Sequence, residues 1–86
     1  LYTPMPTTAQ RSLWSLSKGT TGIVKFISHD LESSYRQRLL DFGISPGAEV
    51  LCLRKSVWGG PRVYQIGGLA ISFEKKIAEM ILLEAR

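Results

Sequence analysis

"DFGISPG", residues 41–47, places two glycines and a proline between a predicted helix and a predicted strand. Gly43 is where we expect the helix to end, because helices commonly close with one residue in the left-handed conformation, which costs glycine almost nothing. Pro46 and Gly47 suit the two central positions of a type II turn, since proline fixes φ near about −65° and glycine accepts a positive φ. The segment therefore predicts a rigid corner that turns the chain from helix directly into strand.

The helix before this corner is predicted from its first turn and its apolar spacing. The tetrapeptide SYRQ matches a capping box, in which Ser34 caps the first turn and Gln37 reaches back to it, so the helix should begin at Tyr35. Tyr35, Leu39 and Phe42 recur at helical spacing, which predicts that they form one face packed on the core.

Strands are indicated on both sides of the helix by β-branched and aromatic residues between glycine-rich turns. The Gly67-Gly68 pair suits the primed turn of a two-residue hairpin. The expected strands are 23–27, 48–55, 62–66, 69–73 and 81–84, the second of them buried on both faces, with a short helix at 74–80. Five or six short strands and two short helices predict a mainly β fold, a small closed barrel without free edges.

Length and composition allow one domain. The chain has 86 residues, of which 44% are apolar and 21% charged, close to ordinary globular usage. Residues 1–10, with two prolines and three threonines, predict a loose N-terminal arm, and residues 11–86 the domain. A single cysteine, Cys52, and the lack of a leader or a membrane-length apolar run favour a cytoplasmic protein.

Motifs that carry catalysis or metal binding are missing from the sequence. We find no phosphate-binding loop, no paired cysteines and no dinucleotide fingerprint, and the seven acidic residues are dispersed, so we expect no enzyme and no cofactor. Cys52 lies in an apolar strand, which favours a buried small side chain over a nucleophile. His29, beside Asp30 and near Glu32, is a candidate only for adventitious binding of a divalent transition metal.

Exposed arginines and a tryptophan are the features that suggest a partner. Arg36 and Arg38 fall on helix faces away from the apolar stripe, and Trp58 lies in a loop bounded by glycine and proline. Such residue types anchor protein interfaces. The alternative for Trp58 is that it folds back and covers one end of the barrel. The predicted partner-binding residues are Arg36, Gln37, Arg38, Trp58, Gly59 and Pro61.

Residues 13–84 together resemble the FeoA family of small cytosolic proteins. The resemblance rests on LWSLSKGTTGIVKFI, YRQRLLDFGISPGAEV, KSVWGGPRVYQIGGLAISF and IAEMILLE, and its most specific part is the helix followed by Gly-hydrophobic-x-Pro-Gly. The family often has proline and an aliphatic residue where this chain has Val57 and Trp58, and commonly has arginine near Glu74. The resemblance implies an SH3-like barrel, with the corner holding the arginine-bearing helix on a rigid mount.

The resemblance also implies a role as a noncatalytic accessory protein of bacterial ferrous iron uptake, docking on the FeoB transporter and its cytosolic G domain. Two alternatives remain open. The chain could be an SH3-like regulatory domain cut from an iron-dependent transcriptional repressor. It could also be a small nucleic-acid-binding barrel; the net charge of +4 favours this alternative, but the basic residues are dispersed along the chain, which argues against it. The sequence leaves a weak homodimer open.

Overall fold

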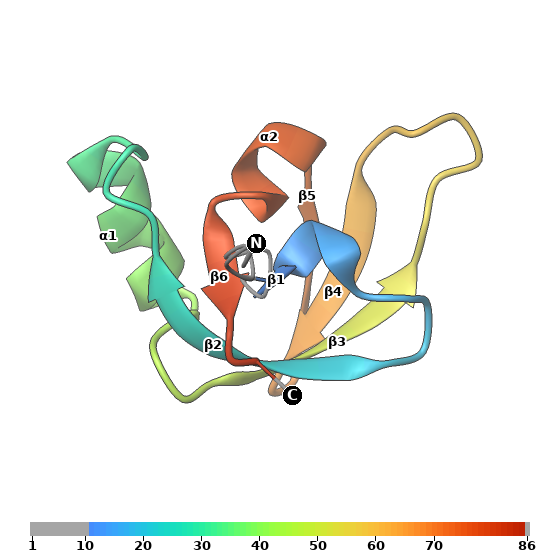
Figure 1. Ribbon diagram of the computed structural model, residues 1–86, viewed down its shortest axis with the longest axis horizontal. Coiled ribbons are helices and arrows are strands. Elements are labelled where there is room, and N and C mark those ends of the chain that lie inside the picture. The colour runs from blue at the N-terminus through green and yellow to red at the C-terminus, as the bar shows by residue number, and fades with distance from the viewer. Residues whose placement is uncertain (1–10, 86) are drawn as a thin grey trace, which may run out of the picture.

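The computed structural model describes residues 11–85, which form a mainly β domain of six antiparallel strands with two short α-helices (Figure 1). The predicted arm, residues 1–10, lies outside the described residues. The elements are β1 (Arg11–Ser12), the 3-10 helix η2 (Leu13–Ser15), β2 (Thr21–Ile27), α1 (Ser33–Asp41), β3 (Glu49–Arg54), β4 (Arg62–Ile66), β5 (Leu69–Phe73), α2 (Lys75–Ala78) and β6 (Ile81–Leu83).

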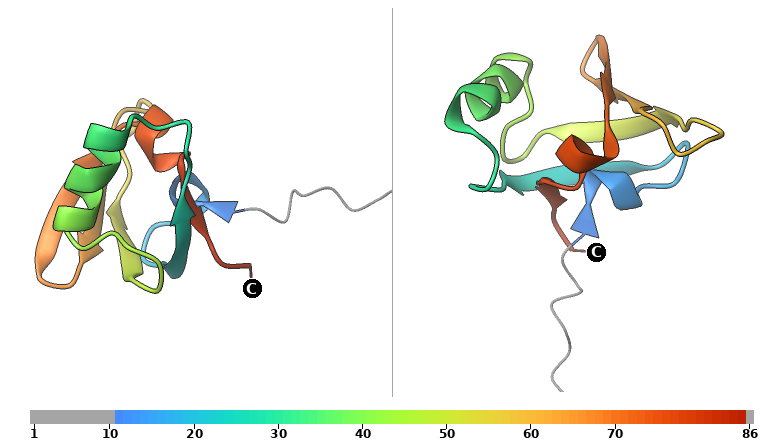
Figure 2. Two further views of the ribbon diagram at one scale, coloured as in Figure 1. Left: turned by 90° about the vertical axis from the view of Figure 1, so that its left-hand side faces the viewer. Right: turned by 90° about the horizontal axis from the view of Figure 1, so that it is seen from above.

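The strands follow the order β1-β6-β2-β3-β4-β5, and every neighbouring pair is antiparallel. The sheet curls around one core, as the two views of Figure 2 show. Within residues 11–85 no pairing joins β5 to β1, so the predicted closed ring was wrong at this seam. β5 therefore keeps one edge unpaired by any described strand.

The core lies between the curled faces of the sheet. Strands bury alternate residues, as period-2 geometry requires, with Val50 and Cys52 of β3 fully buried. Leu51 and Leu53 of the same strand are only half-buried, so the prediction that this strand is covered on both faces was wrong. The buried residues are Leu13, Leu16, Val24, Ile27, Leu31, Leu39, Ile44, Val50, Cys52, Tyr64, Ile66, Phe73, Ala78, Ile81 and Leu83.

The corner after α1 is built as the sequence predicts. Gly43 has φ 99° and its amide donates to the Leu40 carbonyl at 2.9 Å, while the Ile44 amide donates to the Leu39 carbonyl at 2.9 Å. These two bonds define a Schellman motif, and it satisfies two carbonyls that the helix end would leave unpaired. Ile44 and Leu39 are buried in the same cluster, which supplies the apolar contact of the motif.

The second half of the corner is the predicted type II turn. The Ala48 amide donates to the Ser45 carbonyl at 2.9 Å, and Gly47 takes φ 94°. The Gly47 amide then donates to the Val24 carbonyl at 2.8 Å, and the Val24 amide donates to the Ala48 carbonyl at 2.9 Å. The turn is therefore bonded directly to β2 and starts the pairing between β2 and β3.

The start of α1 differs from the prediction. The helix begins at Ser33, its N-cap is Glu32, and no side chain caps it, so the predicted capping box was wrong. Ser34 lies inside the first turn, where its hydroxyl cannot act as an N-cap. The amides of Tyr35 and Arg36 donate to the Glu32 carbonyl at 3.0 and 2.9 Å.

The remaining elements have the predicted type of secondary structure, but some of their lengths differ from the prediction. The β4–β5 hairpin pairs Ile66 with Leu69, and Gly67 has φ 59° while Gly68 is not left-handed, the pattern of a type II′ turn. The second helix covers Lys75–Ala78 rather than residues 74–80. The strand β1 and the 3-10 helix were not predicted, because two- and three-residue elements have no readable periodicity.

Gly43→Val should lower the free energy of unfolding by about 1–3 kcal/mol, because a β-branched residue is strained at a positive φ. Pro46→Ala should cost less, about 0.5–1 kcal/mol, mainly by giving the unfolded chain more freedom. Gly68→Ala is a matched control: an added Cβ meets no atom within 4 Å and φ is not positive, so the change should stay within about 0.5 kcal/mol. If urea melts show a larger loss of stability for Pro46→Ala than for Gly43→Val, this description of the corner is contradicted.

Tyr64 carries a buried hydroxyl. It is fully buried and donates to the Leu13 carbonyl at 3.3 Å. The pKa of Tyr64 is raised from 10.0 to about 12; burial is the main cause, the nearby Cys52 contributes in the same direction, and Arg62 opposes the shift. The folded protein therefore keeps this hydroxyl protonated at pH values where the unfolded chain ionises it.

This raised pKa predicts an alkaline loss of stability. The contribution, about 2–3 kcal/mol, is present below pH 10.0 and is lost as the pH rises to about 12. Tyr64→Phe should cost about 1 kcal/mol at neutral pH and should flatten the decline between these pH values. Urea melts of both proteins from pH 9 to pH 12 measure the difference. If the free energy of unfolding falls equally steeply with pH in both proteins, Tyr64 does not cause the alkaline loss of stability.

Candidate functional site

Helix α1 buries only one of its predicted core residues. Leu39 is 1% exposed, whereas Tyr35, Leu40 and Phe42 are 37%, 41% and 45% exposed. The prediction that Tyr35, Leu39 and Phe42 share a buried face was therefore wrong. The helix lies at one end of the barrel, attached through Leu39 and the corner (Figure 1), so its flanking apolar side chains stay at the surface.

A groove of ≈ 230 Å³ separates α1 from β5. Aromatic and aliphatic side chains form its walls, and the guanidinium of Arg38 adds a positive charge. Its lining residues are Tyr35, Arg38, Leu39, Phe42, Ile71, Ser72 and Phe73. Because β5 ends the strand order, the groove runs beside a strand edge that no described strand occupies. A groove of mixed polar and apolar lining beside an open edge is suited to binding an extended segment of another protein.

The three helix residues predicted to bind a partner have different surroundings. Arg36 is half-buried and donates through Nη1 to the Leu31 carbonyl at 3.0 Å, so it anchors the loop before its own helix. Gln37 is exposed, and its side-chain amide donates to Asp41 at 3.1 Å. Arg38 is exposed and lines the groove. Of the three, Arg38 is the one placed to meet a ligand in the groove.

The loop between β3 and β4 carries the other predicted residues. Trp58 is 92% exposed and its neighbour Val57 is 86% exposed, so the alternative in which Trp58 covers the barrel end is wrong. Gly59 and Pro61 are exposed on the same loop. The loop therefore presents two large apolar side chains to its surroundings.

These two groups of residues lie at opposite ends of the domain. In Figure 1, helix α1 is at the left and the yellow-to-orange loop between β3 and β4 is at the right, and the view from above in Figure 2 agrees. The structure therefore does not bring Arg36 and Arg38 together with Trp58. The predicted single docking surface separates into a groove at one end and an apolar loop tip at the other.

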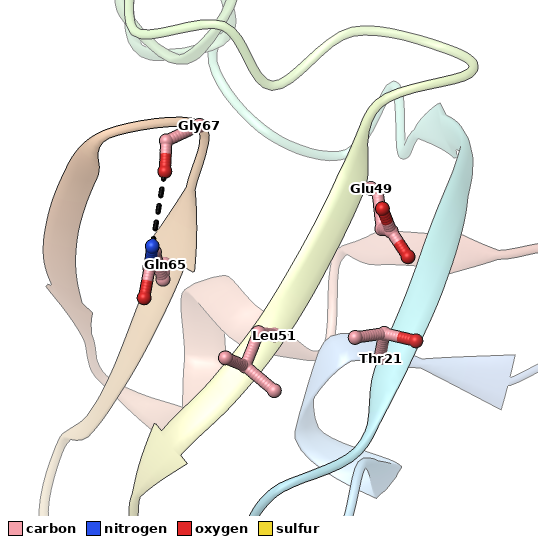
Figure 3. Close-up of a pocket in the computed structure, with 5 residues that line it drawn as sticks. All are labelled: Thr21, Glu49, Leu51, Gln65 and Gly67. Carbon is pink, nitrogen blue, oxygen red and sulfur yellow. Dashed lines mark hydrogen bonds between the residues drawn. The ribbon is translucent and has the colours of Figure 1, made fainter.

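A second pocket, of ≈ 280 Å³, lies over the outer face of β2, β3 and β4 (Figure 3). Its lining residues are Thr21, Glu49, Leu51, Gln65 and Gly67. The Gln65 side chain donates to the Gly67 carbonyl at 3.1 Å and so is held by its own hairpin. The polar groups of this lining are one carboxylate, one hydroxyl and one amide, with no second carboxylate to form an acid–base pair.

The residues considered for metal binding or thiol chemistry stay apart. Within residues 11–85, no three His, Cys, Asp or Glu side chains gather to hold a metal ion, so His29 gains no ligand set from Asp30 and Glu32. Cys52 is a free, buried thiol, as predicted from its apolar strand. No helix in the described part of the chain is long and apolar enough to cross a membrane.

Sequence reasoning missed the groove because it assigned Tyr35 and Phe42 to the core. An apolar pair seven residues apart has the same spacing whether it packs inward or lines a surface groove. Ile71 likewise belongs to a strand whose edge position depends on the order of all six strands. The signal that was available is the excess of apolar residues on α1 beyond what one short helix buries against a small barrel.

The fold and its exposed sites define a small SH3-like barrel with two candidate contact surfaces. The FeoA domain family model matches residues 11–85, and the chain belongs to this family. No curated protein sequence matches the chain significantly.

Solved structures share the architecture. A FeoA-like protein from Clostridium acetobutylicum is 28% identical with a TM-score of 0.74, and the match covers 88% of this chain and 86% of that protein. The zinc complex of FeoA from Stenotrophomonas maltophilia, described as a prokaryotic SH3 domain protein, is 21% identical with a TM-score of 0.74 over 85% of this chain and 88% of that one. It shows likeness of fold alone.

A manganese-dependent transcriptional repressor also contains this fold. It is 24% identical with a TM-score of 0.75, and the match covers 96% of this chain but 44% of the repressor. At this identity the likeness again concerns the fold alone.

Two substitutions on α1 test how the helix is mounted. Leu39→Ala should lower the free energy of unfolding by about 2–5 kcal/mol, because it empties a fully buried site. Phe42→Ala, which truncates a larger but half-exposed side chain, should cost about 1 kcal/mol or less. Thermal melts of both variants measure the contrast. Equal losses would mean that Phe42 belongs to the core and does not line an open groove.

Proposed function

We propose that this protein is a noncatalytic cytosolic accessory protein of bacterial ferrous iron uptake, which docks on the cytosolic region of a FeoB-like transporter through the groove between α1 and β5. Membership of the FeoA domain family supports the role in iron transport. The Stenotrophomonas maltophilia relative is described as possibly acting as a ferrous iron transport activating factor, which supports the same role. The observation that carries the docking site is the groove beside an unpaired strand edge.

The groove offers three complementary contacts to one extended segment. The free edge of β5 can form main-chain hydrogen bonds with an added strand. Phe42, Tyr35 and Ile71 provide apolar surface for an anchoring side chain, the kind of contact that dominates interface energetics. Arg38 can pair with a carboxylate on the segment. The expected ligand is therefore an extended acidic segment with at least one large apolar residue.

The chemistry of the pockets favours binding over catalysis. Neither lining set contains a histidine, a cysteine or a pair of carboxylates, and the buried thiol of Cys52 has no exposed surface. An accessory role works through contact alone, by changing the assembly or the nucleotide cycle of the transporter.

A second candidate function is a regulatory domain of a larger repressor. The observation in its favour is that the fold matches a 44% share of a manganese-dependent repressor. This candidate requires a DNA-binding region elsewhere in the polypeptide. Reading the gene upstream of Leu1 distinguishes the two, because a helix-turn-helix in the same reading frame would support the repressor.

Binding to the isolated cytosolic region of the transporter tests the groove. Phe42→Ala should weaken binding by about 2 kcal/mol, the loss expected for an apolar anchor. Arg38→Ala should mainly slow association and reduce its dependence on salt, as expected for a charge at the rim. Titration calorimetry gives the affinities, and surface-based kinetics gives the rates.

Matched controls locate the contact. Lys25→Gln removes an exposed charge from the middle of β2, and Gln37→Ala alters α1 outside the groove. Both should bind within about 0.5 kcal/mol of the parent. Parent-like binding by the folded Phe42→Ala and Arg38→Ala variants would reject the groove as the docking site.

A further inference from the structure

The tip of the β3–β4 loop is a tight turn with two large apolar residues at its centre. The Gly59 amide donates to the Ser56 carbonyl at 3.5 Å, so Val57 and Trp58 occupy the central positions. Turns of this kind usually place glycine, proline, asparagine or aspartate there. Turn geometry therefore does not require these side chains.

The core does not require them either. Val57 is 86% exposed and Trp58 is 92% exposed. The other tryptophan shows the contrast: Trp14 is half-buried, and the guanidinium of Arg62 lies 3.5 Å from its ring centroid. Trp14 therefore packs against the domain, whereas Trp58 is exposed on a turn.

Two basic residues immediately precede this tip along the chain. No acidic residue occurs between Glu49 and Glu74, and within that span Arg54 and Lys55 are exposed immediately before the turn. Glu74 lies beside the base of the loop, because Phe73 pairs with Arg62, and the exposed Lys75 and Lys76 follow it. The chain as a whole carries +4.

We infer that the β3–β4 loop tip binds the surface of a bilayer containing anionic lipid, with Val57 and Trp58 inserted at headgroup depth and Arg54 and Lys55 on the lipid phosphates. Tryptophan favours the membrane interface, where its ring is partly apolar and its N–H stays hydrated. Each lysine or arginine near an anionic surface adds about 1 kcal/mol of attraction. The exposed Arg54 and Lys55 complement lipid phosphate.

This contact is compatible with docking through the groove. The loop and α1 lie at opposite ends of the longest dimension of the domain (Figure 1), so one end can meet lipid while the other meets a protein. The lipid contact does not depend on the proposed function, since it needs no transporter. Its failure would leave the groove proposal standing.

Vesicle binding of the full chain tests the inference. Flotation with vesicles of phosphatidylcholine containing about one-quarter phosphatidylglycerol should show binding at least about tenfold stronger than with phosphatidylcholine alone. Trp58→Ser should weaken binding to the anionic vesicles by about tenfold, and Lys55→Gln by about fivefold. Raising the salt concentration should release the protein.

Matched substitutions distinguish insertion from adsorption by net charge. Lys25→Gln removes the same charge as Lys55→Gln but from β2, and Leu40→Ser removes an exposed apolar side chain from α1. Each should bind within about twofold of the parent. Brominated lipid should quench the fluorescence of the parent, and Trp58→Phe, which leaves only Trp14, should bind while losing that quenching.

Two outcomes would overturn the inference. If Trp58→Ser binds anionic vesicles as well as the parent does, the protein merely adsorbs through its charge. If no variant binds vesicles, while Trp58→Ser weakens binding to the isolated cytosolic region of a transporter, the loop tip is a protein contact.

Discussion

The bonds between the corner and β2 hold the helix in its place on the barrel. Gly47 donates to Val24, and Val24 donates to Ala48, so the turn that ends the corner is part of the β2–β3 ladder. At the other end of the corner, the amide of buried Ile44 closes α1 by donating to Leu39. A short helix of nine residues would be marginal alone. It is stable here because one end is bonded into the barrel and one residue enters the core.

This mounting explains why α1 presents apolar side chains to its surroundings. The helix packs on the barrel through Leu39 and the corner alone, so it does not bury a whole face. Tyr35 and Phe42 therefore stay partly exposed and line the groove beside the edge of β5. The open edge of β5 and the exposed face of α1 then form one groove. At the opposite end, the β3–β4 loop leaves the barrel and carries Trp58 outward. The barrel thus separates two contact surfaces of different chemistry.

The parts of this structure that follow from local chemistry could be predicted from sequence. The corner depends on Gly43, Pro46 and Gly47, whose backbone preferences act within a few residues, and the β4–β5 hairpin depends on the glycine pair at its turn. The start of α1 was missed because Ser34 has a capping pattern, yet the helix begins earlier, where the Glu32 carbonyl accepts the first amides. Several patterns fit one local sequence, and tertiary packing selects among them.

The candidate sites depend on long-range order and were harder to predict. Arg38 was identified correctly as exposed, whereas the sequence left open whether Trp58 points outward or covers the barrel end. The placement of the two residues at opposite ends follows from the strand order, which local patterns do not contain. The apolar spacing of α1 was visible, but whether Phe42 faces core or groove is decided by the angle at which the corner sets the helix. Ile71 became a groove residue only because β5 is an edge strand.

Native-state amide hydrogen exchange tests most directly whether the corner fixes α1 to the barrel. The account predicts that the amides of Val24, Ile44 and Gly47 exchange only with global unfolding, with the same free energy as the amides of the central strands. A rigidly mounted helix would keep the groove formed before any partner arrives. If these three amides instead exchange through a low-energy local opening, while the strands stay protected, the corner is a hinge and the groove is not preformed.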